Sequence, residues 1–472
     1  MLIRVVAVTM LTLSFTPVRA DLRQEAEAGL KKAIAFFHRQ VAVEGGYVYS
    51  YSGELKLREG EGKAGPRTVW VQPPGTPAVG DAMLEAYERT GEQAYLDAAL
   101  DAGRALVRGQ MHSGGWTNRI EFDPALRKGF AYRVDGPPGK RARNISSFDD
   151  DQTQSALRLL MRLDRATNET DKPIHEAAMY GLDAVIRNQH RNGAWSQVFD
   201  GAHVRDDEPK PASYPTDWPR QHPGGDYWWH YTFNDGAMAA VIETLLEAER
   251  LYGNPKYKEA AIRGGEFILR AQMPPPQPSW AQQYNADMHP AWARKFEPPA
   301  VSSSETAGVI RILIALNQAT GAERFLAPVP AALDWLKKSA LPGGGHARFY
   351  ELQTNKPLYL TRDYQLTYEP NDLPTHYSFI QKDVGLSRLE RQYRNAMSHN
   401  NESRLPTESS RPVSDNEVRR ILDALDERGA WVEQGALKSY GHVGPIIDSR
   451  TFIRNVDRLS RYLAVLRAAP AR

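Results

Sequence analysis

Hydrophobic residues recur with helical spacing in several segments of the chain, and these segments end alike. Each of them closes on a glutamine, a short turn and an aromatic residue. The pairs are Gln40 with Tyr47, Gln110 with Trp116, Gln189 with Trp195, and Gln272 with Trp280. The glutamines follow one another at intervals of 70, 79 and 83 residues. A fixed period of this length is typical of a repeat architecture, with a unit of roughly 70–85 residues.

A second helix is predicted within each unit, and it starts at a short polar motif. The predicted starts are Gly80-Asp81, Asp149-Asp150-Asp151, Asn234-Asp235 and Ser303-Ser304-Glu305. Helical hairpins in series form either an open solenoid or a closed toroid. The long loops recur at the same point of each unit, so they would gather on one face. We therefore predict an all-α fold, an α/α toroid (an incomplete barrel of helical hairpins), with long loops and short strands forming a cleft on that face.

The two ends of the chain differ from the repeats. Residues 1–20 hold Arg4, an apolar run and small residues at positions 18 and 20, which predicts a secretory signal cleaved after Ala20. A secreted or periplasmic protein is expected; the alternative is a buried N-terminal helix. Residues 21–400 are assigned to the catalytic toroid. Residues 401–472 are expected to form a linker and a helical pair, 416–427 and 451–466, that packs on the toroid. Residues 200–231 contain five prolines and indicate an inserted loop.

Composition removes several classes of function. The chain has 59 Lys and Arg residues against 57 Asp and Glu, so it lacks the broad positive charge of a nucleic-acid-binding protein. It has no cysteine, which excludes disulfides, thiolate nucleophiles and cysteine-ligated zinc. We expect a monomer that has neither a nucleic-acid nor a membrane partner.

Three consecutive aspartates, 149–151, are the most unusual polar feature. A single acidic residue at a helix start is explained by capping of the helix N-terminus. Three of them repel one another unless a cation is present. If the repeats superpose, Asp235 lies beside them. Oxygen ligands from neighbouring loops suit calcium better than magnesium, which requires stricter geometry. Asp149, Asp150 and Asp235 are therefore predicted ligands of calcium (Ca2+).

Arginines and tryptophans in the loops indicate an acidic sugar ligand. Arg294, Arg348 and Arg362 lie in segments rich in aromatic residues, with a turn between two short strands separating the last two. Arginine binds carboxylates through two parallel hydrogen bonds. Solvated side chains or structural ion pairs are the alternative. Trp228-Trp229 is expected to be exposed for stacking on sugar rings, whereas Trp116, Trp195 and Trp280 could be core or such platforms.

Four motifs, in this order, resemble the pectate lyases of polysaccharide lyase family ten over about residues 100–390. The motifs are Ser147-Phe148-Asp149-Asp150-Asp151-Gln152-Thr153, Thr232-Phe233-Asn234-Asp235-Gly236-Ala237-Met238, Arg294-Lys295-Phe296-Glu297-Pro298-Pro299-Ala300, and Ala347-Arg348-Phe349-Tyr350-Glu351 with Arg362-Asp363. The resemblance implies an α/α toroid that cleaves polygalacturonate by β-elimination with calcium.

The resemblance also implies roles for individual residues. Asp149, Asp150 and Asp235 would line the site for calcium and an acidic polysaccharide, Arg294 would be the catalytic base, and Arg348 and Arg362 would hold substrate carboxylates. Trp228 is expected to contact substrate as well. Two alternatives stay open: a glycoside hydrolase that pairs Asp149 or Asp150 with Asp235 as acid and base, and a secreted glycan-binding protein without catalysis.

Overall fold

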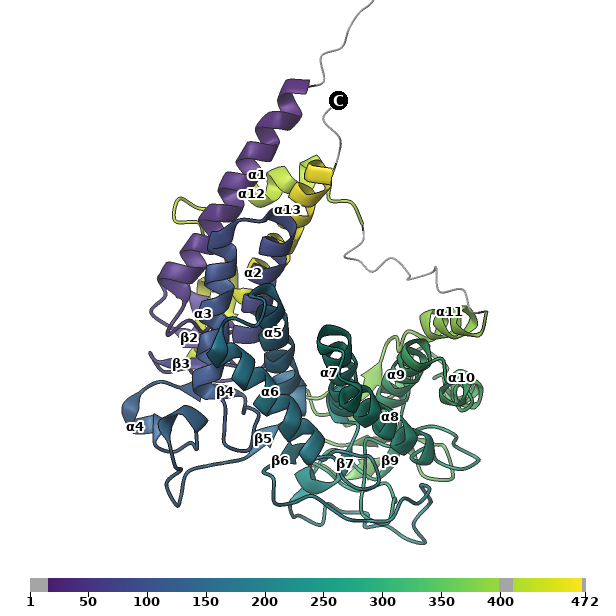
Figure 1. Cartoon of the computed structure of the whole chain (residues 1–472). Coiled ribbons are helices and arrows are strands. Elements are labelled where there is room, and N and C mark those ends of the chain that lie inside the picture. Colours follow the sequence, from purple (N-terminus) through teal and green to yellow (C-terminus); the bar gives the residue numbers. More distant parts are fainter. Residues whose placement is uncertain (1–15, 399–410, 469–472) are drawn as a thin grey trace, which may run out of the picture.

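The computed structural model describes residues 16–398 and 411–468, and its helices form two layers (Figure 1). The inner layer consists of α13 (Ser449–Ala468), α2 (Thr76–Thr90), α5 (Gln152–Ala166), α7 (Ala237–Tyr252) and α9 (Ser303–Thr320), each in contact with the next. The outer layer consists of α1 (Thr16–Phe36), α3 (Gln93–Gly109), α6 (Lys172–Arg187), α8 (Pro255–Arg270) and α10 (Val329–Lys338). In these two ranges, no helix has the length and apolarity needed to cross a membrane.

Two shorter helices complete the layers. α11 (Leu386–Met397) packs on α9 and α10, and α12 (Asp415–Asp423) packs on α1 and α13. α11 lies beyond α9, at one end of the inner layer, and α13 lies at the other end. These two helices lie apart in Figure 1, so the helices form an arch instead of a closed ring. The predicted fold, an incomplete α/α toroid of helical hairpins, is confirmed.

Short antiparallel strands connect the hairpins at one end of the helix layers. In each unit, the strand before the inner helix pairs with the strand that follows the outer helix. The pairs are β3 (Thr68–Trp70) with β4 (Arg119–Glu121), β5 (Ser146–Ser147) with β6 (Val198–Phe199), β7 (Tyr231–Thr232) with β8 (Gln283–Tyr284), and β9 (Ala300–Ser302) with β11 (Phe349–Glu351). The loops therefore gather on one face, as the repeat predicts.

Further strands extend this face around the last unit. β12 (Pro357–Leu360) pairs with β11 and with β13 (Leu366–Thr367), and β10 (His346–Ala347) pairs with β14 (Ile380–Gln381). The turn predicted between Arg348 and Arg362 is thus the connection from β11 to β12.

The two ends of the chain together form one more unit. β1 (Ser50–Ser52), which follows α1, pairs with β16 (His442–Asp448), which precedes α13. β2 (Arg58–Glu59) and β15 (Val432–Leu437) complete the sheet in the order β15-β16-β1-β2. The rings of Phe37 and Phe452 stack with centroids 3.7 Å apart. The segment after residue 410 therefore belongs to the same helix layers as the N-terminal segment.

The predicted secretory signal and linker fall largely outside the described residues. Residues 1–15 of the predicted signal and residues 399–410 of the predicted linker are not among the described residues. Among the described side chains of α1, the buried ones begin at Leu22. Cleavage after Ala20, which stays a prediction, would leave this buried face intact.

The repeated glutamines and tryptophans join consecutive units inside the core. The amides of Gln110, Gln189 and Gln272 each donate to their own turn and to the backbone of the next outer helix or the residue before it, whereas Gln40 is exposed. The acceptors are the carbonyls of Gly114 and Ala177 for Gln110, Gly193 and Ala260 for Gln189, and Pro278 and Pro328 for Gln272. Trp116, Trp195 and Trp280 are buried, and each indole N–H donates to the outer helix before it. These tryptophans are core residues and not platforms for sugars.

Candidate active site

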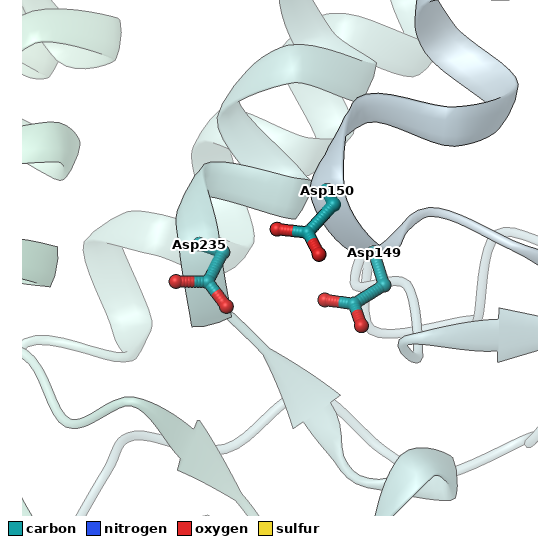
Figure 2. A group of neighbouring side chains, drawn as sticks. All are labelled: Asp149, Asp150 and Asp235. Carbon is teal, nitrogen blue, oxygen red and sulfur yellow. The ribbon is translucent and has the colours of Figure 1, made fainter. Parts of the chain in front are cut away.

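Three aspartates converge on the loop face from two neighbouring units. Asp149 and Asp150 lie in the turn before α5, and Asp235 lies in the turn before α7 (Figure 2). One carboxylate oxygen from each lies within 4.8 Å of the others. The third consecutive aspartate, Asp151, instead forms an ion pair with Arg158. The structure thus brings together the three aspartates that the sequence predicts as calcium ligands; we call them the aspartate cluster.

The same backbone turn presents both parts of the aspartate cluster. Asp150 and Asp235 have φ angles of +45° and +48°, and the residues after them, Asp151 and Gly236, have +62° and +73°. Aspartate tolerates this left-handed region better than most residues, and such conformations concentrate at functional sites. The helix start predicted at Gly80-Asp81 differs from these two turns. α2 begins earlier, at Thr76-Pro77, so Asp81 lies in its second turn, where it pairs with Arg162. Asp81 therefore does not join the aspartate cluster.

Burial and mutual repulsion disfavour the charged form of the cluster. Burial, together with the charges of Asp150 and Asp235, raises the pKa of Asp149 to about 7. Burial and nearby carboxylates raise the pKa of Asp150 to about 6. The Oδ1 atom of Asp149 is buried and has no hydrogen-bond partner among the described residues. A divalent cation would satisfy this oxygen and relieve the repulsion, so the residues present fit calcium.

This charge balance predicts how pH and calcium act on stability. Between about pH 4 and 7 the folded protein holds protons on Asp149 and Asp150 that the unfolded chain releases. The free energy of unfolding therefore falls as pH rises through this window without calcium. Calcium binds the ionised carboxylates of the folded state, so its stabilising effect should grow with pH. We expect the difference in melting temperature between calcium and EDTA to be larger at about pH 8 than at about pH 5. An equal difference at both would contradict calcium binding here.

Two arginines, Arg348 and Arg294, lie beside Asp235. The Nη2 atom of Arg348 is 3.5 Å from Oδ1 of Asp235 and 3.3 Å from Oε1 of Glu305. Its side chain is only 11% exposed and lies 4.5 Å from the centre of the Tyr377 ring. Its buried Nε atom has no hydrogen-bond partner among the described residues. The Nη2 atom of Arg294 is 3.9 Å from Oδ2 of Asp235. Positive and negative groups thus alternate across a few ångströms, which suits a carboxylate ligand bound together with a cation.

Arg294 is held in its charged form by a buried partner. Its Nε donates to Oε2 of Glu297 at 2.8 Å, and its backbone N–H donates to the same oxygen at 3.0 Å. Glu297 is fully buried and also accepts from Gln282 and from the hydroxyl of Tyr377. Burial disfavours the guanidinium cation, but the hydrogen bonds and charge of Glu297 outweigh it, so the pKa of Arg294 is raised.

Two predicted site residues do not touch the cluster. Arg362 is exposed in the turn after β12, where its Nε lies 3.3 Å from a carboxylate oxygen of Asp372. Trp228 is half-buried, and its ring packs edge-to-face on Tyr227. Burial raises the pKa of the Tyr227 hydroxyl, and Arg294 and Asp149 both act on it electrostatically. The roles of Arg362 and Trp228 in substrate binding stay predictions.

Sequence reasoning missed Gln72, which reaches the cluster from the preceding unit. The amide Nε2 of Gln72 donates to Oδ2 of Asp150 at 2.9 Å and to Oε1 of Glu61 at 3.0 Å. No motif surrounds Gln72, so only the three-dimensional arrangement reveals it. Tyr377 and Glu297 were missed as well, although Glu297 lies within the motif that begins at Arg294.

The chain is similar to a known protein family and to several solved structures. The profile of the family described as Pectic acid lyase matches residues 110–345. No curated protein sequence matches the chain. Among solved structures, a family 10 polysaccharide lyase from Cellvibrio cellulosa, a mutant in complex with trigalacturonic acid, is 20% identical with a TM-score of 0.46, over 67% of this chain and 98% of that one. Cellobiose 2-epimerase from Spirochaeta thermophila is 15% identical with a TM-score of 0.48, over 96% and 99%.

The family match covers half of the chain and contains both aspartate turns and Arg294. It includes three complete helical hairpins, α5–α6, α7–α8 and α9–α10, so it spans the central part of the toroid. The chain belongs to the pectic acid lyase family, a family of polysaccharide lyases.

Proposed function

We propose that the protein is a secreted pectate lyase that cleaves polygalacturonate, or a related uronate polymer, by calcium-assisted β-elimination. One observation carries this proposal: the aspartate cluster and the two arginines, Arg294 and Arg348, meet at Asp235. A cation site directly beside two guanidinium groups suits a sugar that bears a carboxylate. Membership of the pectic acid lyase family supports the same chemistry.

β-Elimination requires that the proton on C5 of the uronate leaves while the bond from C4 to the glycosidic oxygen breaks. The C5 proton is α to the carboxylate, so neutralising that carboxylate makes the proton more acidic. Calcium held by Asp149, Asp150 and Asp235 would supply part of this neutralisation. Arg348 would supply the rest, because its buried, unpaired Nε can donate to a carboxylate oxygen and its charge stabilises the enolate-like transition state.

Arg294 is the proposed base that accepts the C5 proton. A guanidinium ordinarily keeps its proton at neutral pH. Glu297 strengthens this tendency, since it raises the pKa of Arg294. The proposal therefore requires activity that rises into the alkaline range, where a larger fraction of Arg294 is neutral.

Replacing Arg348 with lysine should separate a binding role from a structural one. Arg348→Lys keeps the positive charge beside Asp235 and Glu305 but loses the planar pair of donors. We expect a marked loss of kcat/KM on polygalacturonate with little change in melting temperature. The measurement is steady-state kinetics together with thermal unfolding of the two proteins. An equally large loss of stability would instead indicate a structural ion pair.

The glycoside hydrolase alternative is tested by the mass of the products. Hydrolysis adds one water per cleaved bond, whereas elimination adds none, so mass spectrometry of digested polygalacturonate distinguishes the two. One carboxylate oxygen from each aspartate of the cluster lies within 4.8 Å of the others, closer than the roughly 6.5–9.5 Å of an inverting pair; this spacing disfavours an inverting hydrolase but not a retaining one. We expect products without added water. Binding without any product would support the glycan-binding alternative.

A further inference from the structure

A pocket lies between the insert, residues 200–231, and the segment 285–299 that contains Arg294. Its volume is about 360 Å³, within the range of small-molecule sites and large enough for a sugar ring. Ala293, the residue before Arg294, forms part of its wall, and so does Tyr227. Because Tyr227 interacts electrostatically with Arg294 and Asp149, the pocket adjoins the proposed catalytic residues.

The walls of this pocket carry no cationic side chain. Neither lysine nor arginine lines it, and its formally charged residues are Asp217 and Asp226, both exposed. The nearby Arg220 lies 3.9 Å from the centre of the Trp218 ring, but its charge is matched by Glu351, 2.9 Å away. A sugar carboxylate would therefore meet two like charges here without a counter-ion, in contrast to the surroundings of Asp235.

Two of the three histidines in the wall, His222 and His230, lie in surroundings that favour the uncharged ring. Nδ1 of His222 accepts from the N–H of Gly224 at 3.3 Å, so its Nε2 is the donor to the carbonyl of Ala293 at 2.9 Å. This tautomer carries no charge. Burial and the charge of Arg205 lower the pKa of His230. These histidines therefore do not replace the missing cations.

Aromatic side chains supply a preformed apolar surface. Trp218, Tyr227 and Trp292 all line the pocket. The indole N–H of Trp292 donates to the carbonyl of Pro219 at 2.8 Å, which fixes the insert to the segment 285–299. Apolar walls with a few fixed polar groups are typical of sites for small molecules, and without a cation in the wall such a site favours an uncharged ligand.

We propose that this pocket is a subsite for an uncharged sugar unit of the polymer, bound while an ionised uronate occupies the aspartate cluster. This inference rests on the proposed function and extends it to the substrate class. The unit is a hydroxylated ring without formal charge, either a galacturonate with an esterified carboxyl group or a neutral sugar. The enzyme would then act on pectic polymers in which charged and uncharged units are mixed.

The test compares kcat/KM on three polymers: fully de-esterified polygalacturonate, partially methyl-esterified polygalacturonate, and a polymer of alternating galacturonate and rhamnose. Trp218→Ala removes part of the apolar wall and should lower the ratio of kcat/KM on a mixed polymer to that on the de-esterified polymer by about tenfold. Asp226→Lys adds a cation that favours an ionised unit, so it should lower the same ratio. If the ratio falls only for the methyl-esterified polymer, the bound unit is an esterified galacturonate. If it falls only for the polymer that contains rhamnose, the bound unit is a neutral sugar.

Asp206→Lys is the matched control, because it makes the same change of charge on the insert outside the pocket. It should leave the ratio unchanged. Ratios that stay constant in both Trp218→Ala and Asp226→Lys would overturn the subsite. Trp218 is 8% exposed, so the Trp218→Ala variant could unfold. In that case Asp226→Lys decides whether the subsite exists, because Asp226 is exposed and its replacement leaves the core intact.

Failure of the proposed function gives a different result. If no polymer yields an unsaturated product, the lyase activity is refuted, and the subsite is tested by calorimetric binding of fully methyl-esterified trigalacturonate. Binding that Asp226→Lys leaves intact but Trp218→Ala abolishes would still support an uncharged occupant. The absence of binding to the unmodified protein would overturn the subsite as well.

Discussion

Replacing Arg294 with alanine is expected to lower turnover by roughly 10²–10⁴-fold, the usual range for loss of a general base. The half-saturation constant should change much less, because Arg348 remains to hold the substrate carboxylate. Stopped or continuous assays on polygalacturonate give both constants. Normal turnover with only a raised half-saturation constant would show that Arg294 anchors a carboxylate and that another group accepts the proton.

Two further variants make this test specific for proton transfer. Arg294→Lys should keep a small activity, because the ordinary pKa of lysine lies below that of arginine, so a larger fraction of it is neutral at alkaline pH. Glu297→Gln removes the charge that keeps Arg294 protonated, so the rise of rate with pH should move to lower pH. A pH profile that is unchanged in Glu297→Gln would contradict Arg294 as the base.

Replacing Asp235 with alanine is expected to cost both calcium binding and activity. Asp235 is the residue at which the aspartate cluster meets Arg294 and Arg348. Its loss removes a proposed calcium ligand and takes away the carboxylate that partly balances the charges of these two arginines. Loss of an outer partner of a metal ligand already costs roughly 10–100-fold in affinity or activity, and loss of a ligand should cost more. Calcium titrations of activity and of melting temperature measure both effects.

The matched control for Asp235→Ala is Asp151→Asn. Asp151 lies next to the ligands in sequence but pairs with Arg158, and asparagine tolerates its left-handed conformation. This variant should retain the calcium response even where its stability falls. If Asp151→Asn lost the calcium response while Asp235→Ala kept it, Asp151 and not Asp235 would be the calcium ligand.

Much of the fold was predictable because one physical solution repeats. The Gln–aromatic pairs predict the hairpins since three of the four pairs, those of Gln110, Gln189 and Gln272, join one unit to the next through the same hydrogen bonds. The aspartate cluster was predictable for the same reason. Its members occupy equivalent turns of neighbouring units, so superposing the repeats brings Asp150 and Asp235 together.

Other features depend on contacts between residues far apart in sequence. The pairing of β1 with β16 closes a unit across the two ends of the chain, and no local pattern encodes such a pairing. Gln72 reaches Asp150 over 78 positions without belonging to a motif. The position of Arg362 was likewise not given by the sequence: its exposed side chain pairs with Asp372, and its role in substrate binding stays a prediction. Sequence spacing alone does not give the direction in which a loop side chain points.

The most direct test of the central claim is an assay of the purified protein on polygalacturonate with added calcium and with EDTA. Ultraviolet absorbance reports the unsaturated sugar that only elimination forms, and a reducing-end assay counts every cleaved bond. We expect both signals to rise together in calcium and EDTA to abolish them. New reducing ends without absorbance, or equal rates with calcium and EDTA, would contradict a calcium-assisted pectate lyase.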